Sequence, residues 1–415
     1  MKERTSNEYL VVIAGVLLSA YYELPAFVSA IKGIGHIFIL ATVIFLVYCF
    51  RKNHTIKTVE LLLGVSFVLE FLFYALFGDR FEVGMGYLVQ DTIIRYLDIV
   101  TVCILLSAIN ELTENSRKKL LLISISFLLF TVIVTFVYLQ LEPEIVRNLV
   151  TETTPDGYSK GIANYNIVYG AILIVIPIVQ MYRQSRGMHR LLLIGLLGLL
   201  SFFVFDCAFS IAIIVLIVEV LLLVYYASSE NSMRRAFLCI GIGIVSILVV
   251  YNIQSILMLL YDLVDSPSFK VRIKEVQLFL LTGQKGGDLS GRINVYSKSL
   301  STIGKSLLMG YSFIINKNGL GVFVGGHSRI LDYCAELGIL PLIGYLIWLW
   351  HKVMDNFSKE DLIRWNDGKI LFLVMVILMT LNPMYEGYLL YYGLYYLLLI
   401  TKSDLNVLTK EDVMR

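Results

Sequence analysis

The sequence predicts an all-α, polytopic integral membrane protein with about twelve transmembrane helices. Hydrophobic residues make up 58% of the 415 positions, and the mean hydropathy is +0.77. Apolar runs recur along the chain, and many approach the roughly 20 residues that cross a bilayer. Short loops between these runs alternate between rich and poor in Lys and Arg. A soluble domain does not repeat such runs, so the composition excludes that class.

The apolar runs define the predicted transmembrane spans. In chain order they cover approximately 9–31, 33–50, 59–77, 86–108, 119–141, 163–182, 190–205, 207–227, 236–258, 331–350, 369–383 and 387–401. No small-residue cleavage site follows the first run, so we expect a retained helix rather than a signal peptide. We treat 1–415 as a single membrane domain, with 259–330 as a loop subdomain within it.

Basic residues in five short loops determine the predicted orientation, because loops rich in Lys and Arg stay cytoplasmic. These loops follow the second, fourth, sixth, eighth and tenth spans. Their basic residues are Arg51, Lys52 and Lys57, then Arg117, Lys118 and Lys119, then Arg183, Arg186 and Arg190, then Arg234 and Arg235, and finally Lys352, Lys359 and Arg364. Both termini are therefore expected in the cytoplasm.

The longest non-spanning segment, from Tyr261 to Arg329, is then extracytoplasmic and lies between the ninth and tenth spans. It contains more basic than acidic residues. One interpretation is a solvated surface attracted to anionic lipid head groups. The other is a cradle for an anionic substrate, for which a diphosphate is the natural candidate.

Two helices are predicted inside this loop. Residues 267–281 mix apolar and basic side chains, as an interfacial helix does. Ser290 is a plausible N-cap for an amphipathic helix from Arg292 to about Met309. The helix macrodipole disfavours an arginine at a helix N-terminus. A bound phosphate would resolve this conflict, since backbone amides and the guanidinium could share one anion.

The loop returns to the membrane through a run of ionisable residues. His327, Ser328 and Arg329 follow two glycines, and Asp332 and Glu336 sit four residues apart on one helix face. Charged groups in lipid are costly, so these side chains should face protein or water. The plainer interpretation is a loop-to-helix junction with an interfacial histidine.

Further candidate residues lie in the first half of the chain. Lys160 belongs to an earlier external segment, and Asn164 and Asn166 follow it at the start of the sixth span. Asn164 could be an ordinary helix cap. Arg95 lies between Asp91 and Asp98 in the fourth span. One interpretation is an ion pair within this helix, and the other is that Arg95 faces an external cavity.

Three of these stretches together resemble the O-antigen ligase and polymerase superfamily. The run from His327 and Ser328 to Gly338 and Pro341 resembles its signature before a late membrane helix, although Pro341 replaces the usual Gly, Thr or Tyr. The loop helix from Ser290-Gly291-Arg292 to Met309-Gly310-Tyr311 is similar to the superfamily's extracytoplasmic loop. Asn164-Tyr165-Asn166 resembles its Asn-Pro-Asn, with Tyr165 in place of Pro. The superfamily's Ser-Arg-Gly-like element is absent, and Asp206 to Ser210 stands there instead.

This resemblance covers roughly the second half of the chain and implies a GT-C-like fold in the bacterial cytoplasmic membrane. It implies an inverting glycosyltransferase that joins oligosaccharide repeat units carried on polyprenyl (undecaprenyl) diphosphate, in capsule or O-antigen synthesis. Expected partners are the lipid bilayer, a flippase and a chain-length regulator, and not nucleic acid. The alternatives are ligase-type transfer to another acceptor, a transporter, for which we find no clear inverted repeat, and a structural partner in an envelope complex.

The resemblance also suggests roles for individual residues. His327 is the candidate general base, because an imidazole titrates near neutrality. Arg292 and Arg329 are candidates for holding the diphosphate, since a guanidinium binds phosphate through two donors. Further candidate substrate-binding residues are Asn164, Asn166, Arg95 and Lys160, and candidate supporting residues are Asp332, Glu336 and Ser328. The external loop has no clustered carboxylates, so we expect neither a metal site nor a cofactor.

Overall fold

The computed structural model describes residues 2–31, 34–50, 85–151, 159–227, 267–283, 287–305, 327–357, 362–382 and 384–401, together with most of 240–263 and single residues at 233, 307, 308 and 310. Helices are the only regular elements among them. They are α1 (Lys2–Glu23), α2 (Pro25–Ile31), α3 (Ile34–Phe50), α5 (Met85–Ile109), α6 (Glu114–Leu141), α7 (Ile145–Thr151), α9 (Tyr165–Gln184), α10 (Gly187–Asp206), α11 (Ser210–Ala227), α13 (Ile253–Leu263), α14 (Pro267–Thr282), α15 (Gly287–Lys305), α16 (Arg329–Leu337), α17 (Ile339–Met354), α18 (Leu362–Leu381), α19 (Glu386–Leu390), the π-helix η2 (Tyr391–Tyr395) and α20 (Tyr396–Thr401).

The all-α class and the membrane character are confirmed. Three described helices, α6, α9 and α10, are long and apolar enough to cross a membrane, and the pair α1 and α2 could form a fourth span. Several shorter apolar helices accompany them. The count of about twelve stays a prediction, because the third predicted span, 59–77, lies outside the described residues, as does part of the ninth.

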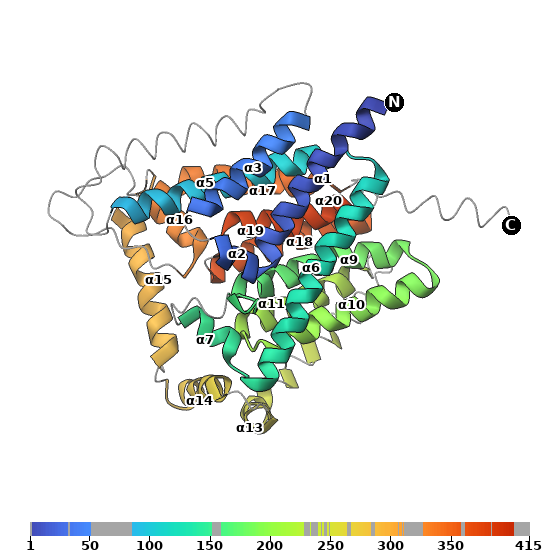
Figure 1. Cartoon of the computed structure of the whole chain (residues 1–415). Helices are drawn as coiled ribbons and strands as arrows, with labels where there is room; N and C mark the ends of the chain where they lie inside the picture. The colour runs from blue at the N-terminus through green and yellow to red at the C-terminus, as the bar shows by residue number, and fades with distance from the viewer. Residues whose placement is uncertain are drawn as a thin grey trace.

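Helix α9 lies at the core of the bundle and packs against α10, α18, η2 and α20 (Figure 1). It is buried along most of its length, as expected for a helix that is apolar on every side. Gly170 allows α9 to approach the ring of Tyr392 closely, because a Cβ at this position would lie 2.4 Å from that ring. The centre of the fold is therefore formed by one early helix and the tyrosine-rich end of the chain.

Two predicted spans are interrupted, which corrects the sequence prediction. The first, 9–31, bends by 96° between α1 and α2, where Pro25 occupies the first position of the new helix. The tenth, 331–350, breaks at Gly338 between α16 and α17. Gly338 has a φ of 92°, a backbone conformation that glycine adopts without steric cost.

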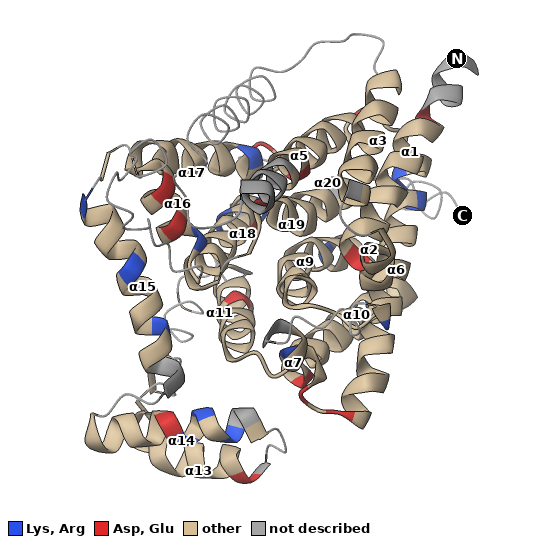
Figure 2. Cartoon of the chain, turned by 60° about the vertical axis from the view of Figure 1, so that its left-hand side comes forward, with Lys and Arg blue, Asp and Glu red and all other residues tan. Residues whose placement is uncertain are grey.

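The loop helices are present, with one change in their bounds. Helix α14 matches the predicted 267–281 closely, whereas α15 runs from Gly287 to Lys305 instead of from Arg292 to about Met309. Ser290 therefore lies inside the helix rather than at its cap. Helices α13, α14 and α15 lie along one side of the bundle, and α15 extends from α14 to α16 (Figure 1). Both α14 and α15 carry Lys and Arg residues, coloured blue on the ribbon in Figure 2.

Buried polar contacts connect the first helix to the last. Glu23 at the end of α1 accepts hydrogen bonds from the hydroxyls of Tyr391, at 2.9 Å, and Tyr396. One residue earlier, the Tyr22 hydroxyl donates to the carboxylate of Asp98 on α5. All five of these side chains are at most 6% exposed. Glu23 and Asp98 thus each have a hydroxyl partner from a segment distant in the sequence.

Contacts between helix termini divide the bundle into two ends. At one end, which we call the Asp367 end, Arg183 at the end of α9 pairs with Asp367 of α18 at 2.5 Å, and Glu8 of α1 accepts from Thr113 at 2.7 Å. At the opposite end, which we call the Arg292 end, the start of α9 faces the end of α18. Helix α9 therefore runs from the Arg292 end to the Asp367 end, and α18 runs back.

This arrangement predicts the sidedness of two exposed lysines. In a background without the five native cysteines, Lys119→Cys at the Asp367 end and Lys298→Cys at the Arg292 end should react with a membrane-impermeant maleimide from opposite sides. We expect Lys298→Cys to label in intact cells and Lys119→Cys only after permeabilisation. Labelling of both cysteines in intact cells would contradict the orientation.

Candidate functional site

Four helices meet at Asn382, the residue that follows α18. Its backbone carbonyl accepts from the Arg329 N–H at the start of α16, at 3.4 Å. The Tyr296 hydroxyl of α15 donates to the neighbouring carbonyl of Leu381, also at 3.4 Å. The Tyr169 hydroxyl of α9 lies near the Asn382 carboxamide. We call this meeting point of α9, α15, α16 and α18 the Asn382 junction.

Two guanidinium groups flank the junction. Arg292 lies one helical turn before Tyr296 on the same face of α15, and both Arg292 and Arg272 of α14 interact electrostatically with the Tyr169 hydroxyl. Arg272 also donates from Nη1 to the Ser210 hydroxyl at the start of α11, at 3.3 Å. The structure therefore places Arg272, which the sequence did not single out among the basic residues of the loop, near the same phenol as Arg292.

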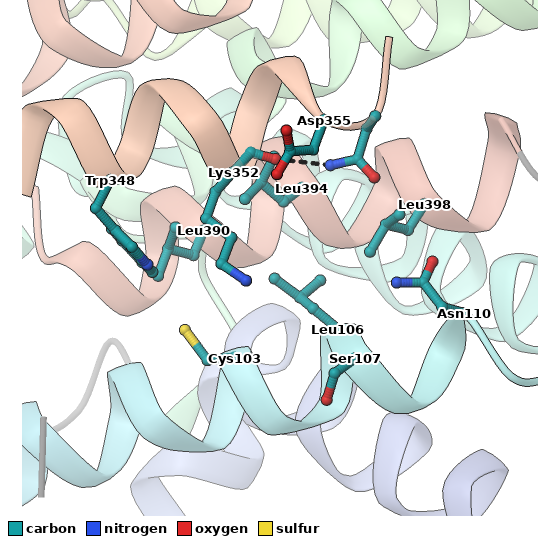
Figure 3. A pocket seen from close by; sticks show the side chains of 11 residues that line it. Cys103, Leu106, Ser107, Asn110, Trp348, Lys352, Asp355, Leu390, Leu394 and Leu398 are labelled. Carbon is teal, nitrogen blue, oxygen red and sulfur yellow. Dashed lines mark hydrogen bonds between the residues drawn. The ribbon is translucent and has the colours of Figure 1, made fainter. Parts of the chain in front are cut away.

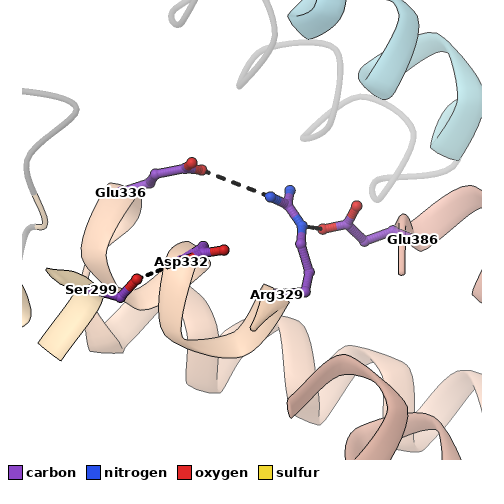
Figure 4. A network of polar contacts seen from close by, with 5 residues as sticks. All are labelled: Ser299, Arg329, Asp332, Glu336 and Glu386. Carbon is purple, nitrogen blue, oxygen red and sulfur yellow. Dashed lines mark hydrogen bonds and ion pairs between the residues drawn. The ribbon is translucent and has the colours of Figure 1, made fainter. Parts of the chain in front are cut away.

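Arg329 has a different environment. It is buried, its Nε donates to Glu386 at 2.6 Å, and its Nη1 lies 4.0 Å from Glu336 (Figure 4). Burial alone would lower the pKa of this guanidinium, but the Glu386 and Glu336 carboxylates raise it above its ordinary value. Its guanidinium also lies 5.6 Å from the ring centre of Tyr333. Arg329 is thus charged and engaged by protein groups, which suits a structural role.

The other residues of this run make structural contacts or face solvent. Ser328 caps α16 by accepting from the Leu331 N–H at 3.3 Å. Asp332 is buried and accepts from Ser299 of α15 at 2.6 Å, which ties α15 to α16 (Figure 4). His327 is exposed to solvent. It precedes Arg329 by two residues, so the two Cα atoms lie within about 7 Å, and His327 is close to the junction.

The early candidates separate into two groups. Asn164 is an ordinary N-cap whose side chain accepts from the Ile167 N–H at 3.1 Å. Asn166 is buried one turn before Tyr169, and its Oδ1 has no hydrogen-bond partner within the described residues; the same holds for Nδ2 of Asn382. Buried amide atoms without partners are rare and require an explanation. Asn166 thus adds a buried polar atom one turn from Tyr169, and Asn382 adds one at the end of α18.

The remaining two candidates do not join the junction in the described structure. Lys160 is exposed and lies 5.9 Å from the ring centre of Tyr138. The side chain of Arg95, on α5, lies outside what the structure describes. Its predicted neighbour Asp98 accepts instead from the Tyr22 hydroxyl.

No protein-family model matches the chain, and a search of curated proteins finds no match. Within the described residues, no three His, Cys, Asp or Glu side chains gather as metal ligands would. The function is therefore inferred from the geometry of the Asn382 junction. Its polar groups are two guanidiniums, two phenols and two buried amide atoms without a hydrogen-bond partner among the described residues.

Removing either Arg329 or Glu386 alone should destabilise the fold strongly, because the two form a buried ion pair. Removing one member of a buried pair leaves an uncompensated charge and costs roughly 3–5 kcal/mol, whereas replacing both with apolar residues is often nearly neutral. We expect Glu386→Leu to lower the denaturation temperature of the detergent-purified protein well below that of the Arg329→Met/Glu386→Leu double variant. An equal fall in denaturation temperature in the single and the double variant would show that an uncompensated buried charge is not the cause of the destabilisation.

Proposed function

We propose that the protein is a polysaccharide polymerase that joins oligosaccharide repeat units carried on a polyprenyl diphosphate at the outer face of the bacterial cytoplasmic membrane. The observation that supports this most is the pair of guanidiniums, Arg272 and Arg292, beside the Tyr169 hydroxyl. In this proposal the Arg292 end is extracytoplasmic, both termini are cytoplasmic, and the full chain has about twelve spans.

A diphosphate leaving group fits two arginines better than one. Each guanidinium can bind phosphate oxygens through two parallel N–H donors. Lys270 and Lys274 on α14 raise the local positive potential and favour approach of an anion. Because Arg329 is held by Glu386 and Glu336, we assign the diphosphate to Arg272 and Arg292, and we assign to Arg329 the role of holding the start of α16.

The proposed reaction is a displacement at the anomeric carbon of the donor sugar. An acceptor hydroxyl attacks from the face opposite the diphosphate, so the anomeric configuration inverts. As the new glycosidic bond forms, the bond to the diphosphate oxygen breaks and its electron pair leaves with the diphosphate. His327 receives the hydroxyl proton, and the two guanidiniums stabilise the charge that develops on the leaving group.

The unpaired amide atoms give the sugar a binding position. Asn166 Oδ1 can accept from a sugar hydroxyl, and Asn382 Nδ2 can donate to one. In this proposal the lipid bilayer delivers the carrier, a flippase supplies it and a chain-length regulator limits the product. Deletion of the gene should leave one repeat unit per acceptor. Free polymer that is not attached to an acceptor would instead indicate ligase-type transfer.

Replacing either arginine by lysine should impair the reaction, since a point charge does not replace a two-donor fork. We expect Arg272→Lys and Arg292→Lys each to reduce polymer yield at matched membrane abundance, by at least about tenfold if one charge-assisted contact is lost. Lys298→Gln, an exposed charge on the same helix α15, is the matched control and should remain near normal. Normal polymer yield in both arginine variants would exclude this pair as the diphosphate site.

Loss of the general base should slow the reaction without unfolding the protein, because His327 is exposed. We expect His327→Ala to reduce the polymerisation rate about 10²–10⁴-fold. The readout is polymer chain length and yield at equal protein level, with Ser328→Ala as the neighbouring control for damage to the α16 cap. An unchanged rate in His327→Ala would assign the proton transfer to another group.

Charge neutralisation by arginines leads us to expect turnover without added divalent ions. The purified protein in lipid should elongate a lipid-diphosphate oligosaccharide at the same rate before and after treatment with EDTA. Activity that disappears with EDTA and returns specifically with magnesium or manganese would refute this part of the proposal.

A further inference from the structure

A polar cavity lies at the Asp367 end, on the opposite side of the bundle from the Asn382 junction. Its volume is about 220 Å³, and it is enclosed by α5, α17 and the run α19–η2–α20 (Figure 3). Each of the three contributes one stripe of side chains at helical spacing. The stripes are Cys103, Leu106, Ser107 and Asn110 of α5, then Trp348, Lys352, Asp355 and Asn356 at and just after the end of α17, and Leu390, Leu394 and Leu398.

The cavity is graded in polarity along the bundle axis. Asn110 and Asp355 follow the last residues of α5 and α17, so they mark its outer part. Leu398 lies beside Asn110, whereas Leu390 lies beside Trp348, which is nearly two turns deeper than Asp355 (Figure 3). The outer part therefore carries charge and amides, and the inner part is mostly apolar. A ligand that fits this gradient has a polar head and an apolar tail.

Three polar groups in the cavity lack protein partners that would explain them. The Lys352 side chain extends toward Cys103 and Leu106 of α5 (Figure 3), and within the described residues no carboxylate pairs with it. Asp355, three residues later, likewise has no cationic partner there. The indole Nε1 of Trp348 is buried and has no hydrogen-bond acceptor among the described residues. The cavity thus presents an ammonium, a carboxylate and a free N–H donor that do not satisfy one another.

We propose that this cavity binds the head group of a zwitterionic aminophospholipid, of the phosphatidylethanolamine type. The lipid phosphate would pair with Lys352 and the lipid ammonium with Asp355. The Trp348 indole would donate to an ester carbonyl of the glycerol, and an acyl chain would run along Leu390 toward the bilayer interior. Tryptophan and lysine are the residues that anchor helices at the membrane–water boundary, which is the depth this binding mode requires.

The charges favour a zwitterion over a purely anionic lipid. Asp355 repels a second negative charge, and the C-termini of α5 and α17 both end at the outer part of the cavity, where their partial negative charge favours a cation. A primary ammonium can also donate hydrogen bonds to Asp355, which a trimethylammonium cannot. Phosphatidylethanolamine should therefore bind more tightly than phosphatidylglycerol and more tightly than phosphatidylcholine. The inference is independent of the proposed polymerase activity, because it uses none of its residues.

The test is native mass spectrometry of the full chain, purified in detergent, delipidated and titrated with dioleoyl forms of the three lipids. We expect wild-type protein to retain one phosphatidylethanolamine in preference to the other two. Lys352→Gln and Trp348→Phe should each weaken this retention, the first by about tenfold as expected for one charge-assisted hydrogen bond. Asp355→Asn should remove the preference over phosphatidylglycerol. Lys119→Gln and Glu111→Gln, which change exposed charges at the same end, are the matched controls and should behave as wild type.

Equal retention of the three lipids by wild-type protein would overturn the proposal, as would unchanged selectivity in both Lys352→Gln and Asp355→Asn. A preference for phosphatidylglycerol would overturn the role of Asp355. Trp348→Phe keeps an aromatic six-membered ring and removes the pyrrole part of the indole with its N–H donor, so it tests the contribution of that part of the side chain to retention. Gel filtration of each variant shows whether it folds. A variant that fails is replaced by Asn110→Ser, which shortens a polar side chain in the outer part of the cavity and should weaken retention.

Discussion

The bundle depends on how it satisfies carboxylates that are buried among apolar helices. An ionisable group in such surroundings is costly unless a partner reaches it. Glu23, Asp98 and Glu386 are each almost fully buried. Their partners come from remote segments: Tyr391 reaches Glu23 across 368 positions of sequence, and Arg329 reaches Glu386 across 57. Hydrophobic packing alone would allow many helix arrangements, whereas these pairs are formed in very few.

The same pairs connect the functional candidate to the core. Glu386, which holds Arg329, is followed by Gly387, where a Cβ would lie 1.7 Å from the Asp98 carboxylate. Asp98 in turn binds Tyr22, the neighbour of Glu23. Polar contacts, linked through adjacent residues of the chain and the close approach at Gly387, therefore connect the start of α16 to the bend between α1 and α2. The position of α16, and with it His327, is determined by the packing of the first and last helices.

Sequence patterns predicted where the helices lie better than they predicted which helices contact one another. The interfacial helix α14 and the cap at Asn164 were predictable because both are local, one from composition and one from a side chain that bonds its own backbone. The break at Gly338 was not, since an apolar run hides a change of direction. The pairing of Arg329 with Glu386 and the grouping of Arg272 with Arg292 were also beyond reach, because the residues involved lie on different helices. The span count, the orientation and the catalytic role of His327 remain predictions.

The π-helix at Tyr391–Tyr395 has a consequence for how the chain tolerates change. Tyr391 and Tyr396 both donate to the same oxygen of Glu23 although they are five residues apart. In an α-helix each residue turns by about 100°, so positions five apart point in clearly different directions. The wider turn of the π-helix brings them onto one face. Deleting a single residue here would rotate everything after it and withdraw one hydroxyl from Glu23. This segment can therefore vary in side chains more readily than in length, and related chains should keep the number of residues across it.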